Sequence, residues 1–211
     1  MTRRTQESFN FYSHLVGVIA AIVGTAYLIY TVRSSTAHVA LSIVYGFSVI
    51  LLFSASATYH ALKQKEDEIS IWRKLDHIAI FFMIAGTYTP ICYVYLSGWW
   101  KWSIITIQWG LVIVGLFLKF FYLKAPRYFN TFIYLFMGWI GIMPIKKLLT
   151  AMPPIAVFYL FAGGLSFTVG ATLYAIKKPG FPSGIGFHEI FHLFVLLGGV
   201  FHYLLVYIAL V

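Results

Sequence analysis

Seven apolar stretches, each of membrane-spanning length, follow one another along the chain with little polar sequence between them. They cover residues 11–32, 37–62, 75–97, 101–123, 128–149, 153–176 and 187–210. A helix needs about 20 apolar residues to cross a bilayer, and these stretches lack the alternation of membrane-barrel strands. Because lipid satisfies no backbone polar group, such segments must be helical. We therefore predict an all-α integral membrane protein, a single seven-transmembrane helix bundle over residues 1–211.

The composition excludes a soluble protein. Hydrophobic residues make up 61% of the 211 positions and charged residues only 10%, with a mean hydropathy of +0.85. A soluble domain of this length needs more polar side chains to cover its surface. The single cysteine, Cys92, rules out an internal disulfide.

Basic residues predict the orientation, because lysine and arginine are enriched in cytoplasmic connections. With the N-terminus inside, eleven of the 15 basic residues face the cytoplasm: Arg3, Arg4, Lys63, Lys65, Arg73, Lys74, Lys119, Lys124, Arg127, Lys177 and Lys178. The others are Arg33, Lys101, Lys146 and Lys147. We expect a plasma-membrane protein with its N-terminus in and its C-terminus out. The net charge of +9 is then a topology signal rather than a nucleic-acid surface.

Two histidines, His188 and His192, stand one helical turn apart at the start of the last stretch. Residues at i and i+4 share a helix face, so the pair forms half of a zinc site. His60 ends the second stretch, and Asp76 begins the third, at the same predicted depth. Ser56 precedes His60 by one turn. Ionisable residues at such positions in a membrane segment point to function.

These residues together predict a zinc centre near the cytoplasmic face. His60, His188 and His192 would be the ligands, and a water would take the fourth position. Three neutral ligands leave the ion its full charge, which lowers the pKa of the water to about 7. Asp76 would hold that water as general base, and Ser56 would donate a hydrogen bond to it or to a substrate oxygen.

Four further residues border the same region and are expected around the ligands: Glu7, His14, His77 and Glu189. His77 points about 100° away from Asp76 on a helix, which favours a supporting or surface position. The string from His188 to His192 also fits the zincin pattern, in which Glu189 would be the general base. Intramembrane proteases of that kind need another acidic ligand in an aspartate–glycine context, whereas Asp76 is followed by His77.

Four segments resemble the signatures of a known family: residues 7–14 (ESFNFYSH), 56–60 (SATYH), 75–80 (LDHIAI) and 188–192 (HEIFH). They resemble the bacterial hemolysin III proteins, which belong with the progestin and adipoQ receptor family that includes the adiponectin receptors. The resemblance implies a seven-helix bundle, a cytoplasmic N-terminus and zinc near the cytoplasmic side.

By the same resemblance, His60, His188 and His192 would bind the ion directly. Asp76 would reach it through water, and Ser56 would lie beside them. The similar alkaline ceramidases hydrolyse an amide. Related receptors often carry Gln at the position of Glu189, which weakens it as a base.

Three functions follow as alternatives. The first is a zinc-dependent hydrolase of a membrane-lipid amide or ester, and the second a non-catalytic sensor of membrane fluidity with structural zinc. The third is a pore-forming cytolysin. The spans disfavour it, because they are typical of a protein that stays in the membrane and not of a secreted toxin that inserts later. The resemblance best supports membrane lipid homeostasis, with a membrane lipid as substrate or ligand. The sequence predicts no particular oligomeric state.

Overall fold

The computed structural model describes residues 3–65, 70–121, 126–179 and 186–211, and every regular element in this part of the chain is a helix. The elements are, in order, α1 (Arg3–Thr31), α2 (Thr36–Leu62), α3 (Ile71–Tyr95), α4 (Gly98–Phe121), α5 (Arg127–Trp139), the 3-10 helix η1 (Ile140–Ile142), α6 (Ile145–Ala151), α7 (Pro154–Ile176) and α8 (Phe187–Leu210). The prediction of an all-α protein is confirmed. Lys124, one of the basic residues predicted to face the cytoplasm, lies outside the described residues.

Short polar residues start two of the long helices. Ser35 caps α2 by accepting a hydrogen bond from the backbone N–H of His38, at 3.3 Å. Ser70 caps α3 in the same way through the N–H of Arg73. A serine at this position satisfies one of the backbone donors that a helix start leaves unpaired. The chain can therefore begin a new helix directly after a short connection.

Six of the seven predicted stretches correspond to one helix each, with ends that agree to within a few residues. The main difference is α1, which begins at Arg3 instead of residue 11. Two polar residues before residue 11 contact the bundle: Asn10 is only 2% exposed, and Glu7 forms a hydrogen bond with His60. Because they face the bundle rather than solvent, these polar residues extend the helix instead of ending it.

The fifth stretch, predicted as one helix over residues 128–149, is broken. α5 and η1 form one segment, and α6 leaves it at an angle of 58°. Pro144 stands immediately before α6, where a missing N–H and a fixed φ favour a break. A proline inside an apolar stretch predicts a kink, and the bend at Pro144 agrees with that expectation. By contrast, α3 continues as one helix through Pro90.

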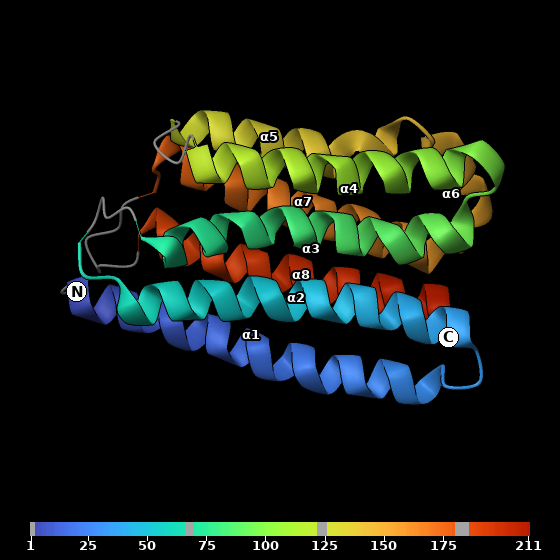
Figure 1. Cartoon of the computed structure of the whole chain (residues 1–211), viewed down its shortest axis with the longest axis horizontal. Coiled ribbons are helices and arrows are strands. Elements are labelled where there is room, and N and C mark those ends of the chain that lie inside the picture. Colours follow the sequence, from blue (N-terminus) through green and yellow to red (C-terminus); the bar gives the residue numbers. More distant parts are fainter. Residues whose placement is uncertain (1–2, 66–69, 122–125, 180–185) are drawn as a thin grey trace.

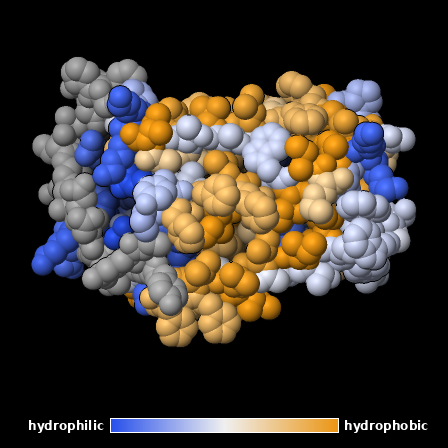
Figure 2. All heavy atoms as spheres, turned by 90° about the horizontal axis from the view of Figure 1, so that it is seen from above, coloured by the Kyte–Doolittle hydropathy of each residue, from blue (hydrophilic) through white to orange (hydrophobic). Residues whose placement is uncertain are grey.

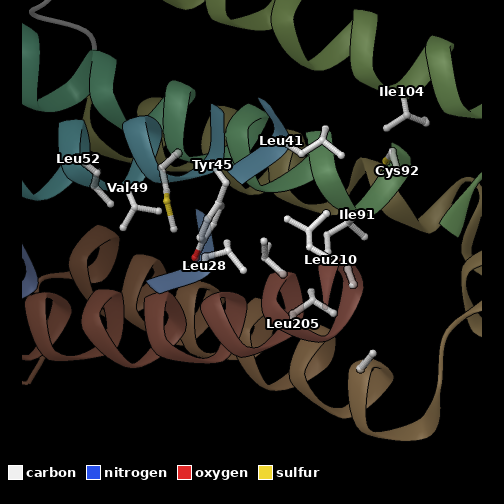
Figure 3. Close-up of a cluster of buried hydrophobic side chains, with 14 of the residues drawn as sticks. Leu28, Leu41, Tyr45, Val49, Leu52, Ile91, Cys92, Ile104, Leu205 and Leu210 are labelled. Carbon is white, nitrogen blue, oxygen red and sulfur yellow. The ribbon is translucent and has the colours of Figure 1, made fainter. Parts of the chain in front are cut away.

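The helices lie side by side, and the two ends of the chain are at opposite ends of the bundle (Figure 1). α2 packs between α1 and α3, and α8 packs on α7 while also contacting α1, α2 and α3. The buried apolar core fills the space between these helices, with Leu41 and Tyr45 from α2 across from Leu205 and Leu210 from α8 (Figure 3). α2, α3 and α8 are therefore held in fixed register.

The outer surface carries a broad apolar band with hydrophilic residues at both ends (Figure 2). Large apolar side chains are exposed along it, such as Phe117 at 62% and Phe132 at 67%. Such a surface is stable only in lipid. Six helices have the length and composition of a span, and α5 to α6 provide a seventh if the bent pair counts as one. The chain is a multi-pass membrane protein.

Lys119 departs from the predicted role of a loop charge. The structure buries it to 2% exposure, where its Nζ donates a hydrogen bond to Oδ1 of Asn130. Its Nζ also lies 5.4 Å from the centre of the Tyr134 ring. α4 and α5 therefore meet through a buried polar contact, which the charge count alone does not reveal.

Candidate metal centre

Three histidines from two helices converge at the end of the bundle that carries the N-terminus. His60 lies in the last turn of α2, and His188 and His192 lie in the first turns of α8. Their ring nitrogens all lie within 4.8 Å of one another. His60 and His192 are 3% and 1% exposed. Contacts between α1, α2 and α8 bring together residues that are 128 positions apart in sequence.

The spacing of the nitrogens fits a zinc ion. Nε2 of His188 lies 3.3 Å from Nε2 of His60. Two nitrogens bound tetrahedrally at about 2.0–2.1 Å lie roughly 3.3 Å apart. The buried Nδ1 of His192 has no hydrogen-bond partner among the described residues. Neutral imidazoles on a buried face are the donor set that zinc prefers, so these residues fit the predicted ion.

Glu7 orients one of the three rings. Nδ1 of His60 donates a hydrogen bond to Oε2 of Glu7 at 2.7 Å, and Nζ of Lys63 donates to Oε1 at 2.5 Å. Because Nδ1 carries the proton in this bond, Nε2 is left with a free lone pair. A carboxylate behind a ligating histidine fixes the tautomer and strengthens the ligand. The structure thus brings Glu7 to the position expected of a residue around the ligands.

His14 packs on the cluster without joining it. Its ring stacks on the ring of His192, with centroids 3.8 Å apart and planes inclined by 25°. It is 2% exposed, and its two ring nitrogens have no hydrogen-bond partner among the described residues. The three-histidine group does not include it. Its position suits a ring that restrains the orientation of His192.

Asp76 and Ser56 share a cavity with the three histidines. The cavity has a volume of about 570 Å³, and its wall includes all five of these residues. Ser56 is 3% exposed, and the Asp76 side chain is 19% exposed. The rest of the wall is mainly apolar and extends along α3 as far as Cys92. A ligand that reaches the histidines would therefore contact a carboxylate, a hydroxyl and a long apolar surface.

His77 and Glu189 take different positions. His77 also lines the cavity, and its Nδ1 donates to the backbone oxygen of Arg73 at 2.8 Å. Glu189 is 3% exposed and does not belong to the cavity wall among the described residues. Its Oε2 accepts the N–H of Gly186 at 2.7 Å, and its Oε1 accepts from Asn10 at 3.4 Å. Glu189 thus caps the start of α8, and this geometry does not support the zincin reading.

One part of the cavity wall is not apparent from sequence patterns. Arg73 and Arg127, counted only as loop charges, both line the cavity. The guanidinium carbon of Arg127 lies 4.5 Å from the ring centre of Tyr174, and the Tyr174 ring is 5.6 Å from that of His188. A basic residue just before an apolar stretch was the only signal for Arg127. That signal does not distinguish a loop charge from a residue turned inward.

Comparisons with known proteins show which family the chain resembles. A family model described as Haemolysin-III related matches residues 2–203. Hemolysin-3 of Bacillus cereus is 35% identical over 204 residues, which cover 94% of this chain and 90% of the relative. The Hemolysin-3 homolog of Bacillus subtilis (strain 168) is 33% identical, with coverage of 92% and 89%.

A more distant relative has an additional segment beyond the shared bundle. The Adiponectin receptor protein of Drosophila melanogaster is 26% identical, and the match covers 93% of this chain but 49% of the relative. The shared region is therefore the membrane bundle that carries the three histidines here. The match to the family model and the bacterial relatives confirm the resemblance seen in the four sequence segments. The chain belongs to the haemolysin III-related family of membrane proteins, with adiponectin receptors among its more distant relatives.

Proposed function

We propose that this protein is a zinc-dependent hydrolase that cleaves an amide or ester bond of a membrane lipid and so contributes to membrane lipid homeostasis. The observation that carries the proposal is the shared cavity, whose wall holds His60, His188, His192, Asp76 and Ser56. We place this site at the cytoplasmic face of a seven-span bundle in the plasma membrane, on the strength of the basic-residue bias.

The three histidines would hold the ion. When bound, zinc acts as a Lewis acid and makes a coordinated water acidic near neutral pH. The Asp76 carboxylate, on the same wall, would accept a proton from the attacking water and pass it to the leaving nitrogen or oxygen. Ser56 would donate a hydrogen bond to the carbonyl oxygen as negative charge develops there. The products are a carboxylic acid and an amine or alcohol.

The shape of the cavity supports a lipid substrate. Its wall runs along α3 from Asp76 at the histidine end to Cys92. At about 1.5 Å per helical residue, this distance corresponds to roughly 24 Å. Apolar residues such as Ile80, Met83 and Ile91 line that length. An extended acyl chain fits such a surface, and its polar end would then lie beside the histidines.

A second candidate is a non-catalytic sensor in which zinc braces the bundle. It is favoured by the origin of the ligands, because His60 comes from α2 and the other two come from α8. An ion shared between these helices would stabilise only the folded bundle. In this candidate, Asp76 would matter little.

The test separates the two candidates through Asp76→Asn, a nearly isosteric change. The purified wild-type protein should contain about one zinc ion per chain. The variant should keep the zinc and its thermal stability in detergent. Cells that carry the variant should accumulate a lipid, and the purified variant should no longer hydrolyse that lipid. Loss of a general base typically lowers the rate by about 10²–10⁴.

A double variant, His188→Ala with His192→Ala, provides the matched control. It should lose the zinc and unfold at a lower temperature, because the ligands themselves are gone. Full zinc content in the double variant would overturn the metal assignment. Normal lipid composition and activity with Asp76→Asn would overturn the hydrolase and leave the structural-zinc candidate.

A further inference from the structure

Arg127 is an arginine held in place at the cavity wall by aromatic rings rather than by a carboxylate. Its guanidinium carbon lies 4.5 Å from the ring centre of Tyr174 and 5.2 Å from that of Phe187. Such stacking orders the planar group while its edges stay available for hydrogen bonds. Arg127 begins α5, whereas its two aromatic neighbours come from α7 and α8.

The hydrogen-bonding capacity of Arg127 is incompletely used. Its Nη1 is buried and has no hydrogen-bond acceptor among the described residues. Three ion pairs are found among the described residues, two made by Glu7 and one by Asp76, and none of them includes Arg127. A buried cationic donor without an acceptor is costly. An acceptor supplied by a ligand would remove that cost.

The charge of the wall indicates the kind of acceptor. Asp76 is the one carboxylate on the described wall; it lies 3.6 Å from Nδ1 of His77 and forms no ion pair with Arg127 among the described residues. The guanidinium of Arg127 therefore brings to the wall an excess of positive charge that no described carboxylate offsets. This excess selects against a cationic headgroup and favours a group of negatively charged oxygens, which a guanidinium binds through two parallel hydrogen bonds.

We propose that Arg127 binds an anionic oxygen group, a phosphate or a carboxylate, on a lipid whose apolar chain occupies the same cavity. The Tyr174 ring contacts both the guanidinium of Arg127 and the ring of His188. The anionic group therefore sits next to the polar end of the ligand, near the bond to be cleaved. This inference rests on the proposed lipid hydrolase and specifies its substrate class as an anionic lipid.

The test measures binding with ligands that cannot be hydrolysed, so its result does not depend on turnover. An ether-linked lysophosphatidate and its neutral counterpart, the 1-O-alkylglycerol of the same chain, are titrated into the purified full-length protein and followed by native mass spectrometry. Oleate serves as the carboxylate ligand. Inorganic phosphate alone shows whether a free anion suffices, because its adduct has a different mass.

Wild-type protein should bind the lysophosphatidate and oleate at least about tenfold more tightly than the alkylglycerol. Arg127→Gln should weaken both anionic ligands by about 10- to 100-fold, the range for hydrogen bonds to a charged group. Its affinity for the alkylglycerol should stay within about twofold, which also shows that the variant is folded. Arg127→Lys should give an intermediate loss, since the charge stays and the planar fork is removed.

Lys74→Gln is the matched control. It removes a positive charge from the same end of the bundle, but Lys74 contacts the backbone oxygen of Phe120 and does not line the cavity. Its affinities should equal those of the wild type.

Equal wild-type affinity for the alkylglycerol and the lysophosphatidate, or unchanged anion binding in Arg127→Gln, would overturn the proposal. A phosphate adduct at the lysophosphatidate concentration would assign the site to a free anion instead. The hydrolase proposal is tested separately, by the lipid composition and activity of Asp76→Asn, so the two proposals can fail independently.

Discussion

Glu7→Gln tests whether the carboxylate behind His60 tunes the metal centre. Glu7 comes from the first turns of α1 and bonds both Nδ1 of His60 at 2.7 Å and Nζ of Lys63 at 2.5 Å. Glutamine keeps the size of the side chain and an oxygen acceptor, but it removes the negative charge. The ring of His60 then loses the partner that fixes its tautomer and raises its basicity.

The expected magnitude follows from this geometry. The hydrogen bond is short, His60 is 3% exposed, and the Glu7 side chain is 17% exposed, so water replaces the carboxylate poorly. Loss of such an outer partner lowers metal affinity by about 10- to 100-fold. This range corresponds to about 1.4–2.7 kcal/mol at 25 °C. The loss of zinc affinity in Glu7→Gln should be near the lower limit, about tenfold, because the amide oxygen of Gln still accepts a hydrogen bond from Nδ1 of His60.

Zinc affinity is measured by competition with a chromophoric chelator in detergent solution. Lys63→Met is the matched control, because it removes the other partner of Glu7 and leaves the bond to His60 intact. It should change the affinity by less than about threefold, as expected for a partly exposed ion pair. Both variants should unfold near the wild-type temperature once saturated with zinc.

Two outcomes would refute the reasoning. Wild-type affinity in Glu7→Gln would show that Glu7 does not support the ligand. An equal loss in Lys63→Met and Glu7→Gln would assign the effect to the general electrostatic field instead of the hydrogen bond to His60.

The remaining predictions concern packing and topology. A Cβ atom on Gly86 would lie 2.1 Å from Oγ of Ser48, so Gly86→Ala should destabilise the α2–α3 contact by about 1–3 kcal/mol. Gly110→Ala, whose Cβ would meet no atom of another helix within 4 Å, should not destabilise the protein in the same thermal unfolding assay. Reporter fusions should place the N-terminus and the connection after Leu62 in the cytoplasm and the C-terminus outside. A cytoplasmic signal from the C-terminal fusion would reverse the orientation and remove the basis for a cytoplasmic site.

The all-helical membrane fold follows from the sequence alone. Lipid offers no hydrogen bonds to the backbone, so apolar stretches of spanning length must form helices whatever their neighbours are. The break near Pro144 is equally local, since the missing N–H and the ring act on the adjacent turn. The predicted stretch begins at residue 11, whereas α1 begins at Arg3, because Glu7 and Asn10 bond to residues of α2 and α8, contacts that no local pattern records.

The convergence of His60 with His188 and His192 was also accessible from sequence. Helical periodicity places two of them on one face, and the common depth of the span ends places the third beside them. The structure places their ring nitrogens within 4.8 Å of one another. Depth is a one-dimensional quantity, so it predicts which residues lie in one layer of the bundle. It does not predict which of them face the same interior.

The direction of each side chain within that layer was decided only by tertiary packing. Glu7 faces His60, whereas Glu189, which directly follows His188 in sequence, turns away and caps α8. Arg127 turns inward onto Tyr174, although it resembles an ordinary loop charge. Rotation of a helix about its axis is set by the burial of its whole surface against several neighbours. The energy of that packing is spread over many weak contacts between helices, and it cannot be obtained from single segments of the sequence.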